Sequence, residues 1–267
     1  GDSTSLTKWS MKMPPAQVGN AYLNFIASHD GIGMRPAEGV LSEEEISDML
    51  KRLKKNGSQF SMRKLPSKQE KVYEANISLF SALQYTDIDS TGKFALERFI
   101  ASHCIILSIE GVPAFYFNSF FATKNDDKSY LNSKVKRDLN RHKWNYSNLE
   151  ATFNDKKSVE NNCYELLKKL ISIRKAQPAF HPNATQFTLN LNKNIFSVWR
   201  QSRDRRQSIF AITNVTSKNI ELNTNMINLI DDEQWYDLLN PEIGFKDEQK
   251  IKLGPYQTIW ITNFKQE

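Results

Sequence analysis

The clearest hydrophobic pattern along the chain is that of an amphipathic helix over residues 43–55. Ser42 and Glu45 form a capping box at its start. Lysines in the last turn and Gly57 beyond it favour a stop at this point. The apolar positions that share one face are Ile46, Met49, Leu50 and Leu53. Apolar periodicity also predicts helices over residues 92–109 and 159–176.

Two short apolar runs, residues 22–27 and 111–117, predict buried strands. Continuous hydrophobicity is typical of strands in a parallel sheet that is covered on both faces. Residues 58–72 are polar and broken by Pro66, which predicts a loop or a small excursion. The order strand, excursion, helix, strand indicates an α/β fold. Residues 118–157 predict a long polar loop region.

The pattern changes after about residue 184, where short apolar segments alternate with Asn, Asp, Gly and Pro clusters. This pattern predicts a small antiparallel β domain. The predicted strands contain residues 187–189, 195–199, 209–212, 235–238 and 258–261. We therefore predict two parts: an α/β part over residues 1–183, with a small excursion at about 40–72, and a β domain over residues 184–267.

The charge balance is basic, with 36 Lys and Arg against 30 Asp and Glu. Such a balance is compatible with nucleic-acid binding, or with positive charges that are simply solvated. The densest basic cluster, residues 134–137, lacks the interleaved aromatic residues of a groove for single strands. The charges are dispersed among acids, so we expect no nucleic-acid partner.

The chain has two cysteines, Cys104 and Cys163, and no C-x-x-C motif. This arrangement favours buried free thiols in a reducing compartment, and we expect a cytoplasmic protein. No apolar run approaches the roughly 20 residues that a membrane span needs. No motif requires a metal ion or an organic cofactor, so we expect none.

Candidate chemistry lies where the first predicted strand ends, at His29 and Asp30, with two glycines shortly after. A carboxylate at the end of a barrel strand can stabilise an oxocarbenium-like transition state as a glycosidic bond breaks. The neighbouring His can hydrogen-bond a sugar hydroxyl, and a nearby Arg can hold the carboxylate ionised. The alternative is a simple turn in which Asp30 caps its own backbone. The residues alone leave both interpretations open.

Several segments together resemble the α-amylase family of glycoside hydrolases, and more narrowly its sucrose phosphorylase branch, including glucosylglycerate phosphorylase-like members. The resemblance covers nearly the whole chain. The segments that carry it are residues 25–36 (FIASHDGIGMRP), 70–83 (EKVYEANISLFSAL), 111–117 (GVPAFYF), 124–126 (KND), 137–142 (RDLNRH) and 174–183 (RKAQPAFHPN).

The resemblance implies a retaining enzyme on a (β/α)8 barrel that is followed by a β-sheet domain. It places Asp30 on the third catalytic carboxylate, which stabilises the transition state at the end of the seventh strand. The residues that it implies for sugar binding are His29, Arg137 and Arg141, and those that it implies for the acceptor-side loop are Asn125 and Asp126. The excursion after the seventh strand matches residues 40–65.

This sequence also departs from the family pattern. The nucleophilic Asp and the general-acid Glu belong to the fourth and fifth strands, and no segment here matches them. A retaining mechanism needs both carboxylates about 5 Å apart. Residues 1–183 therefore supply only about strands 7 and 8 of a TIM barrel, with their helices. Asn118 and Ala122 stand where relatives often carry His and Gly, which leaves the acceptor preference open.

We therefore predict the C-terminal part of an α-glucoside phosphorylase that is inactive by itself. Its partners would be the α-glucoside, inorganic phosphate and the missing N-terminal barrel half. An unpaired apolar strand edge would also favour self-association. The alternatives are a parent that hydrolyses glycosides, and a non-catalytic sugar-binding or assembly module derived from the family.

Overall fold

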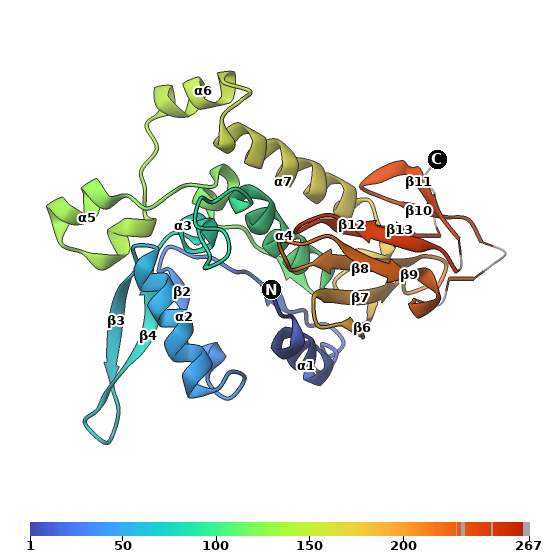
Figure 1. Cartoon of the computed structure of the whole chain (residues 1–267), viewed down its shortest axis with the longest axis horizontal. Coiled ribbons are helices and arrows are strands. Elements are labelled where there is room, and N and C mark those ends of the chain that lie inside the picture. Colours follow the sequence, from blue (N-terminus) through green and yellow to red (C-terminus); the bar gives the residue numbers. More distant parts are fainter. Residues whose placement is uncertain (228, 231–232, 247, 264–267) are drawn as a thin grey trace. The chain divides into compact units, whose positions relative to one another are not determined.

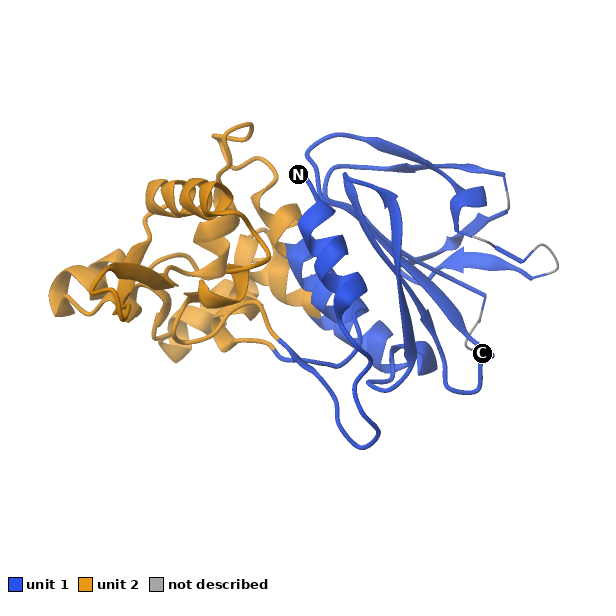
Figure 2. Cartoon of the chain, turned by 90° about the horizontal axis from the view of Figure 1, so that it is seen from below, with its two compact units in different colours: residues 1–24, 100–114, 168–267 blue, residues 25–99, 115–167 orange. Residues whose placement is uncertain are grey.

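A computed structural model describes residues 1–227, 229–230, 233–246 and 248–263. The chain forms two compact units, and neither is continuous in sequence (Figure 2). Unit 1 contains residues 1–24, 100–114 and 168–267, and unit 2 contains residues 25–99 and 115–167. The units do not follow the expected boundary at residue 183, and that boundary stays a prediction.

Unit 2 contains a three-stranded antiparallel sheet of order β2-β4-β3 together with short helices (Figure 1). Its strands and longer helix are β2 (Ile32–Gly33), α2 (Glu43–Lys55), β3 (Gln59–Lys64) and β4 (Glu70–Asn76). Its short helices are η1 (Arg35–Ala37), α3 (Leu79–Gln84), η2 (Phe117–Phe121), α5 (Asp127–Ser133), η3 (Lys136–Asn140) and α6 (Tyr146–Asn154). Helices α4 (Ala95–Ser108) and α7 (Val159–Lys175) begin in this unit and continue into unit 1.

The predicted helix α2 is confirmed together with its capping box. The Ser42 side chain accepts a hydrogen bond from Glu45 N, and the Glu45 side chain accepts one from Ser42 N. The apolar face of α2 packs on β4, since Ile46 and Leu53 share one buried core with Met34, Ala75 and Ile77. Helices α4 and α7 also agree with the prediction to within a few residues.

Of the two alternatives for residues 58–72, a loop or a small excursion, the loop is wrong, because β3 and β4 form an antiparallel hairpin there. Pro66 lies in the turn between the strands, where no ladder hydrogen bond is required of it. The loop was predicted because most side chains in this segment are polar. Backbone pairing with neighbouring strands suffices to form a strand here, although neither β3 nor β4 alternates between buried and exposed residues along its whole length.

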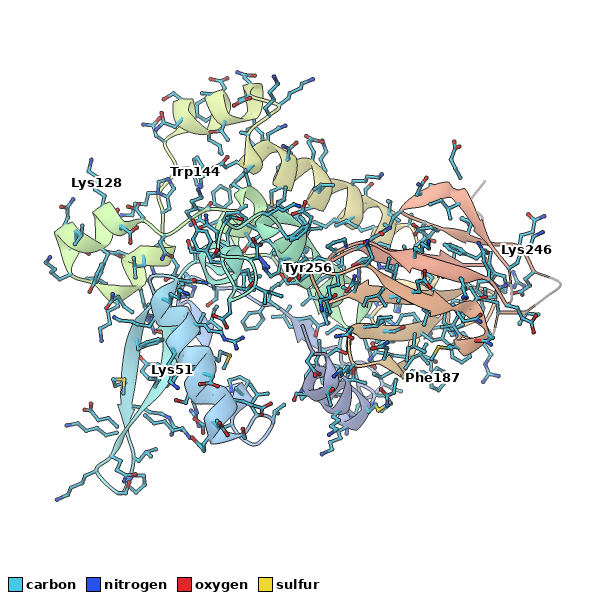
Figure 3. All side chains as sticks on the ribbon, viewed as in Figure 1. Lys51, Lys128, Trp144, Phe187, Lys246 and Tyr256 are labelled. Carbon is cyan, nitrogen blue, oxygen red and sulfur yellow. The ribbon has the colours of Figure 1, made fainter. Side chains whose placement is uncertain are left out.

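The predicted polar loop over residues 118–157 contains four short helices instead, namely η2, α5, η3 and α6. Local caps start two of them, because Asp126 accepts from Ser129 N and Asn145 accepts from Ser147 N. Trp144, labelled in Figure 3, packs edge-on against Phe121, with 5.6 Å between ring centroids. Aromatic packing of this kind fixes a segment that has little apolar periodicity of its own.

Unit 1 contains a six-stranded antiparallel sheet of order β11-β10-β13-β8-β7-β6 and a two-stranded sheet of β12 and β9. The strands of both sheets are β6 (Thr185–Asn192), β7 (Ile195–Gln201), β8 (Ser208–Asn214), β9 (Ile220–Asn223), β10 (Trp235–Asp237), β11 (Asn240–Phe245), β12 (Lys250–Leu253) and β13 (Thr258–Thr262). The unit also contains α1 (Thr4–Lys12), η4 (Pro178–Phe180) and η5 (Thr224–Met226).

The predicted antiparallel β region is confirmed, since each of the five predicted segments lies in or overlaps one of these strands. Side chains from both sheets share one buried core, which includes Phe210, Leu222, Trp235 and Ile251. Strands β9, β11 and β12 were not predicted. They are short, and β11 is mostly exposed, so their hydrophobic signal is weak.

A separate parallel pair in unit 1 joins β1 (Leu23–Asn24) to β5 (Val112–Pro113). The strands predicted over residues 22–27 and 111–117 are thus much shorter than expected, and the prediction that they are buried is wrong. Leu23 is 63% exposed and Val112 is 43% exposed. Within the described residues each strand has one strand neighbour only, so the outer edges and the side-chain faces lack cover.

Across the described ranges, none of the helices has both the length and the hydropathy that a bilayer span requires. Cys104 and Cys163 are free and buried, as predicted. Burial raises the pKa of each thiol to about 12, so both stay protonated at neutral pH.

Candidate functional site

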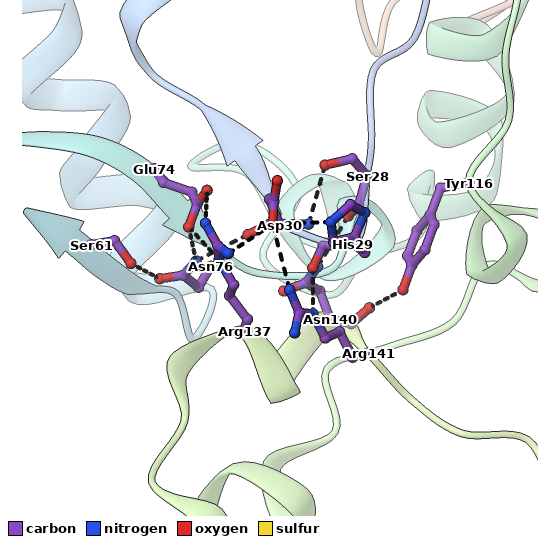
Figure 4. A network of polar contacts seen from close by, with 10 residues as sticks. All are labelled: Ser28, His29, Asp30, Ser61, Glu74, Asn76, Tyr116, Arg137, Asn140 and Arg141. Carbon is purple, nitrogen blue, oxygen red and sulfur yellow. Dashed lines mark hydrogen bonds and ion pairs between the residues drawn. The ribbon is translucent and has the colours of Figure 1, made fainter.

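His29 and Asp30 occupy the two central positions of a tight turn from Ser28 to Gly31 (Figure 4). Gly31 N donates to Ser28 O across 3.2 Å, and Asp30 N donates to Ser28 Oγ across 3.1 Å. Gly31 has a φ of +110°, and a Cβ there would collide with the carbonyl oxygen of Ala75. A glycine is therefore required after the His-Asp pair for two reasons, its positive φ and the lack of space for a Cβ beside Ala75.

Side chains hold the backbone carbonyl groups of this turn from three directions. Asn76 Nδ2 donates to Asp30 O across 3.0 Å. Asn140 Nδ2 donates to Ser28 O and to His29 O across 3.1 and 3.0 Å. Arg141 Nε donates to His29 O across 2.8 Å. Because the peptide groups are fixed, the Asp30 side chain leaves the turn in a defined direction.

Two arginines and a histidine surround the Asp30 carboxylate. Arg137 Nη1 lies 3.0 Å from Asp30 Oδ1, Arg141 Nη2 lies 3.4 Å from it, and His29 Nε2 lies 3.3 Å from it. All three contacts go to Oδ1. The Asp30 side chain is 38% exposed, so each pair adds at most about 1 kcal/mol to stability. The arrangement fixes a negative charge at the surface of unit 2 more than it stabilises the fold.

Glu74, which the sequence reasoning missed, binds the other side of Arg137. Arg137 Nε and Nη2 donate to the two carboxylate oxygens of Glu74 across 3.0 Å each. Glu74 also accepts from Asn76 Nδ2 across 2.8 Å. This hydrogen bonding raises the pKa of the Arg137 guanidinium, while desolvation opposes it. One arginine thus bridges a buried carboxylate and an exposed one.

The signal that could have revealed this network is the alternation in β4. Glu74 and Asn76 are two residues apart, so their side chains leave the strand on the same face. Both are buried, and so is Ala75 between them. A charged residue in a strand buried on both faces needs a partner of opposite charge. Asn140, on η3, gave no comparable signal because its partners are backbone carbonyls.

Asn125 and Asp126 do not join the group around Asp30. Asn125 Oδ1 accepts from Ser78 N across 2.9 Å, and Asn125 N donates to Ser81 Oγ. Asp126 caps α5 and lies 2.8 Å from His142 Nδ1. Desolvation acts to raise the Asp126 pKa, but hydrogen bonds from Ser129 N and His142 prevail and lower it. Both residues hold the base of the segment that carries Arg137 and Arg141.

Curated relatives match nearly the whole chain. Glucosylglycerate phosphorylase of Allomeiothermus silvanus is 31% identical over 261 residues, which cover 98% of this chain and 44% of that protein. Glucosylglycerate phosphorylase of Escherichia coli is 30% identical over 258 residues, which cover 96% of this chain and 44% of that protein. The chain belongs to the sucrose phosphorylase-like branch of the α-amylase family. No protein-family model matches the chain.

This member of the sucrose phosphorylase-like branch spans less than half the length of the curated relatives it matches and corresponds to their C-terminal part. The crystal structure of sucrose 6F-phosphate phosphorylase from Thermoanaerobacter thermosaccharolyticum matches 80% of this chain and 40% of that one, with a TM-score of 0.64 and 20% identity. That likeness shows a fold shared with part of an α-amylase-like barrel enzyme, and the arrangement of a barrel fragment in this chain stays a prediction. Assignment of β1 and β5 to barrel strands 7 and 8 stays a prediction.

Family membership does not by itself assign a role to any residue of the phosphorylase-like chain. Within the described residues, no group of three or more His, Cys, Asp or Glu side chains could hold a metal ion. The arrangement around Asp30 can present a fixed carboxylate beside hydrogen-bond donors. A polyhydroxylated ligand that develops positive charge during reaction would match this chemistry.

Proposed function

We propose that the chain is the C-terminal part of a retaining phosphorylase that transfers a glucosyl unit from an α-glucoside to inorganic phosphate. The α-glucoside would resemble sucrose or glucosylglycerate. The observation that carries the proposal is the Asp30 carboxylate, held through Oδ1 by Arg137 and Arg141, with His29 Nε2 3.3 Å from the same oxygen. The chain that carries it matches glucosylglycerate phosphorylases over 98% and 96% of its length.

In this proposal Asp30 stabilises the transition state. Breakage of the glycosidic bond leaves positive charge on the sugar carbon and ring oxygen, and a fixed carboxylate lowers the energy of that state more than that of the bound substrate. The two arginines occupy Oδ1, so that Oδ2 can face the sugar. His29, 67% exposed, would form a hydrogen bond with a sugar hydroxyl through the ring nitrogen that does not face Asp30.

Arg137 and Arg141 also bind the glucosyl unit in this proposal, because a guanidinium carries more donors than Asp30 Oδ1 and Glu74 accept. Asn125 and Asp126 belong to the acceptor side. They would shape it by fixing the segment that carries both arginines, through Ser78, Ser81 and His142.

The remaining part of the phosphorylase would supply the nucleophilic Asp and the general-acid Glu, about 5 Å apart. It would also supply strand neighbours for β1 and β5, whose outer edges are open within the described residues. This chain alone would therefore be inactive, and it would self-associate through these edges.

Release of glucose 1-phosphate tests the proposal. Sucrose, sucrose 6-phosphate and glucosylglycerate would each be incubated with phosphate and either this chain or the chain joined to the preceding segment of its own gene product. We expect turnover only with the joined form. The Asp30→Asn variant of that form should lose at least 100-fold in kcat, by analogy with the loss of other groups that stabilise developing charge, about 10²–10³-fold.

Asp127→Asn is the matched control, because Asp127 is an exposed carboxylate in the same unit, and its activity should equal that of the parent. Near-normal turnover of Asp30→Asn would remove Asp30 from the catalytic role. Release of glucose without glucose 1-phosphate would identify a hydrolase. Sugar binding without turnover by the joined form would identify a non-catalytic module.

A further inference from the structure

A small cavity lies beneath the turn that carries His29 and Asp30, entirely within unit 2. It offers about 10 Å³ to the centre of a water-sized molecule, which is about the minimum needed for one water. Apolar side chains, among them Ile77, Phe80 and Phe99, form part of its wall. No carboxylate is among its lining residues, all of which lie in described parts of the chain.

Three of the lining residues each have a buried side-chain oxygen atom without a hydrogen-bond partner within the described residues. The atoms are Asn118 Oδ1, Thr123 Oγ1 and Asn140 Oδ1. All three residues are more than nine-tenths buried. A buried polar atom without a partner costs about 1–3 kcal/mol, so three around one cavity call for a common explanation.

The orientation of the two amides is fixed by their nitrogen atoms. Asn140 Nδ2 donates to the carbonyls of Ser28 and His29, and Asn118 Nδ2 donates to His142 O across 3.1 Å. Carbonyl oxygens accept and never donate, so flipping either amide would place two acceptors against each other. The Oδ1 atoms of Asn118 and Asn140 are therefore acceptors that need a donor.

We propose that one buried water molecule binds in this cavity, donating to Asn118 Oδ1 and Asn140 Oδ1 and accepting from the Thr123 hydroxyl. A water has two donors and two acceptor sites, so it satisfies all three groups at once. A cation with oxygen ligands would instead leave the Thr123 proton without an acceptor, and the lining carries no negative charge to compensate it.

The bound water would connect η2, residue 123 and η3 beneath the His29–Asp30 turn. Asn140 is the key member, because its amide nitrogen holds the Ser28 and His29 carbonyls while its oxygen binds the water. The site therefore supports the turn from below. This inference does not depend on the proposed function.

A crystal structure of the chain at better than about 1.5 Å, with a parallel soak in rubidium chloride, tests the site. We expect one density peak within about 2.6–3.1 Å of all three oxygens and no anomalous rubidium signal there. An anomalous peak would show a cation site. A cavity without density, or direct hydrogen bonds that satisfy Asn118, Thr123 and Asn140 within the protein, would show that no ligand binds. Each of these results would overturn the proposal.

Thr123→Val and Thr123→Ser form a matched pair of variants. Valine keeps the shape of threonine but removes the hydroxyl, whereas serine keeps the hydroxyl. We expect the valine variant to lose the density peak and to melt about 2–6 °C lower, and the serine variant to keep the peak. An unchanged peak and melting temperature in Thr123→Val would contradict the assigned hydrogen bond. If that variant does not fold, the density of the unsubstituted chain still decides the question.

Discussion

At the residue scale, the candidate site depends on one guanidinium that is shared by two carboxylates. Arg137 lies 3.0 Å from Glu74 Oε1 and 3.0 Å from Asp30 Oδ1. The Glu74 side chain is only 8% exposed, whereas Asp30 is in contact with solvent. The buried partner fixes the guanidinium, and the fixed guanidinium then holds the exposed carboxylate. In this group of three residues, the buried Glu74–Arg137 pair contributes to stability, and the Arg137–Asp30 contact determines where the exposed carboxylate lies.

Replacing Glu74 by glutamine should therefore lower the free energy of unfolding by about 1–3 kcal/mol. Glutamine keeps the size of the side chain but loses the charge that Arg137 binds. Urea denaturation measures the change. Glu70→Gln is the control, because Glu70 lies at the exposed start of the same strand. Equal losses in the two variants would mean that the Glu74–Arg137 pair contributes nothing.

Asp126 makes stability depend on pH. Its folded pKa lies below the ordinary value of 3.8, so its contribution is present above that value and is lost as pH falls through 3.8 and then through the folded pKa. We expect Asp126→Asn to lose stability at pH 6 and to show a shallower loss between pH 5 and pH 2.5. Thermal unfolding across this range measures it. Asp127→Asn, an exposed neighbour, should keep the slope of the unsubstituted chain.

At the element scale, the Ser28–Gly31 turn is defined by what packs against it. Its backbone lies against β4, which belongs to the hairpin that the sequence did not predict. Asn76 and Glu74 reach the site from that same strand. The hairpin is therefore part of the site rather than a peripheral excursion. A substitution that separates the turn from β4 should therefore disturb the conformation of the turn and also the packing of the hairpin.

Gly31→Ala should lower the free energy of unfolding by roughly 2–4 kcal/mol, because it adds a backbone clash to an unfavourable positive φ. Gly39→Ala separates the two effects. Gly39 also has a positive φ, +79°, but a Cβ there would meet nothing within 4 Å. Urea denaturation of both variants should show the larger loss at Gly31. Similar losses would mean that the turn moves away from β4 without cost.

At the scale of the whole molecule, the short parallel pair in unit 1 has open outer edges within the described residues. Leu23 and Val112 stand directly opposite each other in the register of β1 and β5, and both are exposed. Two parallel strands rarely suffice as a sheet, because their backbone groups and side-chain faces need neighbours. Association with another chain would supply them.

We expect the isolated chain to self-associate in sedimentation experiments and Leu23→Lys to reduce the association constant at least tenfold. A lysine on the open edge repels a second copy and is a known safeguard of exposed strands. Val18→Lys is the control, since Val18 is fully exposed but lies outside any strand. A strictly monomeric unsubstituted chain at high protein concentration would contradict the prediction.

The sequence by itself predicted features that depend on neighbours in the chain. Helix α2 and its capping box follow from residues three or four positions apart, and the antiparallel region follows from alternation within short segments. The His29-Asp30 pair and the segments that resemble the sucrose phosphorylase branch are contiguous in the sequence, so they could also be recognised without a structure. The roles assigned to Asp30, His29, Arg137 and Arg141 stay proposals, although these four residues do meet in space.

Only the tertiary structure decided which side chains converge on the turn. Asn140 and His29 are 111 positions apart, and Arg137 and Glu74 are 63 apart. No local pattern encodes such pairs, because each depends on how separate elements pack. The same limit explains the hairpin over residues 59–76 and the exposure of β1 and β5. Backbone pairing gives polar segments a strand conformation, and burial of an apolar strand requires neighbours that a hydrophobic run cannot specify.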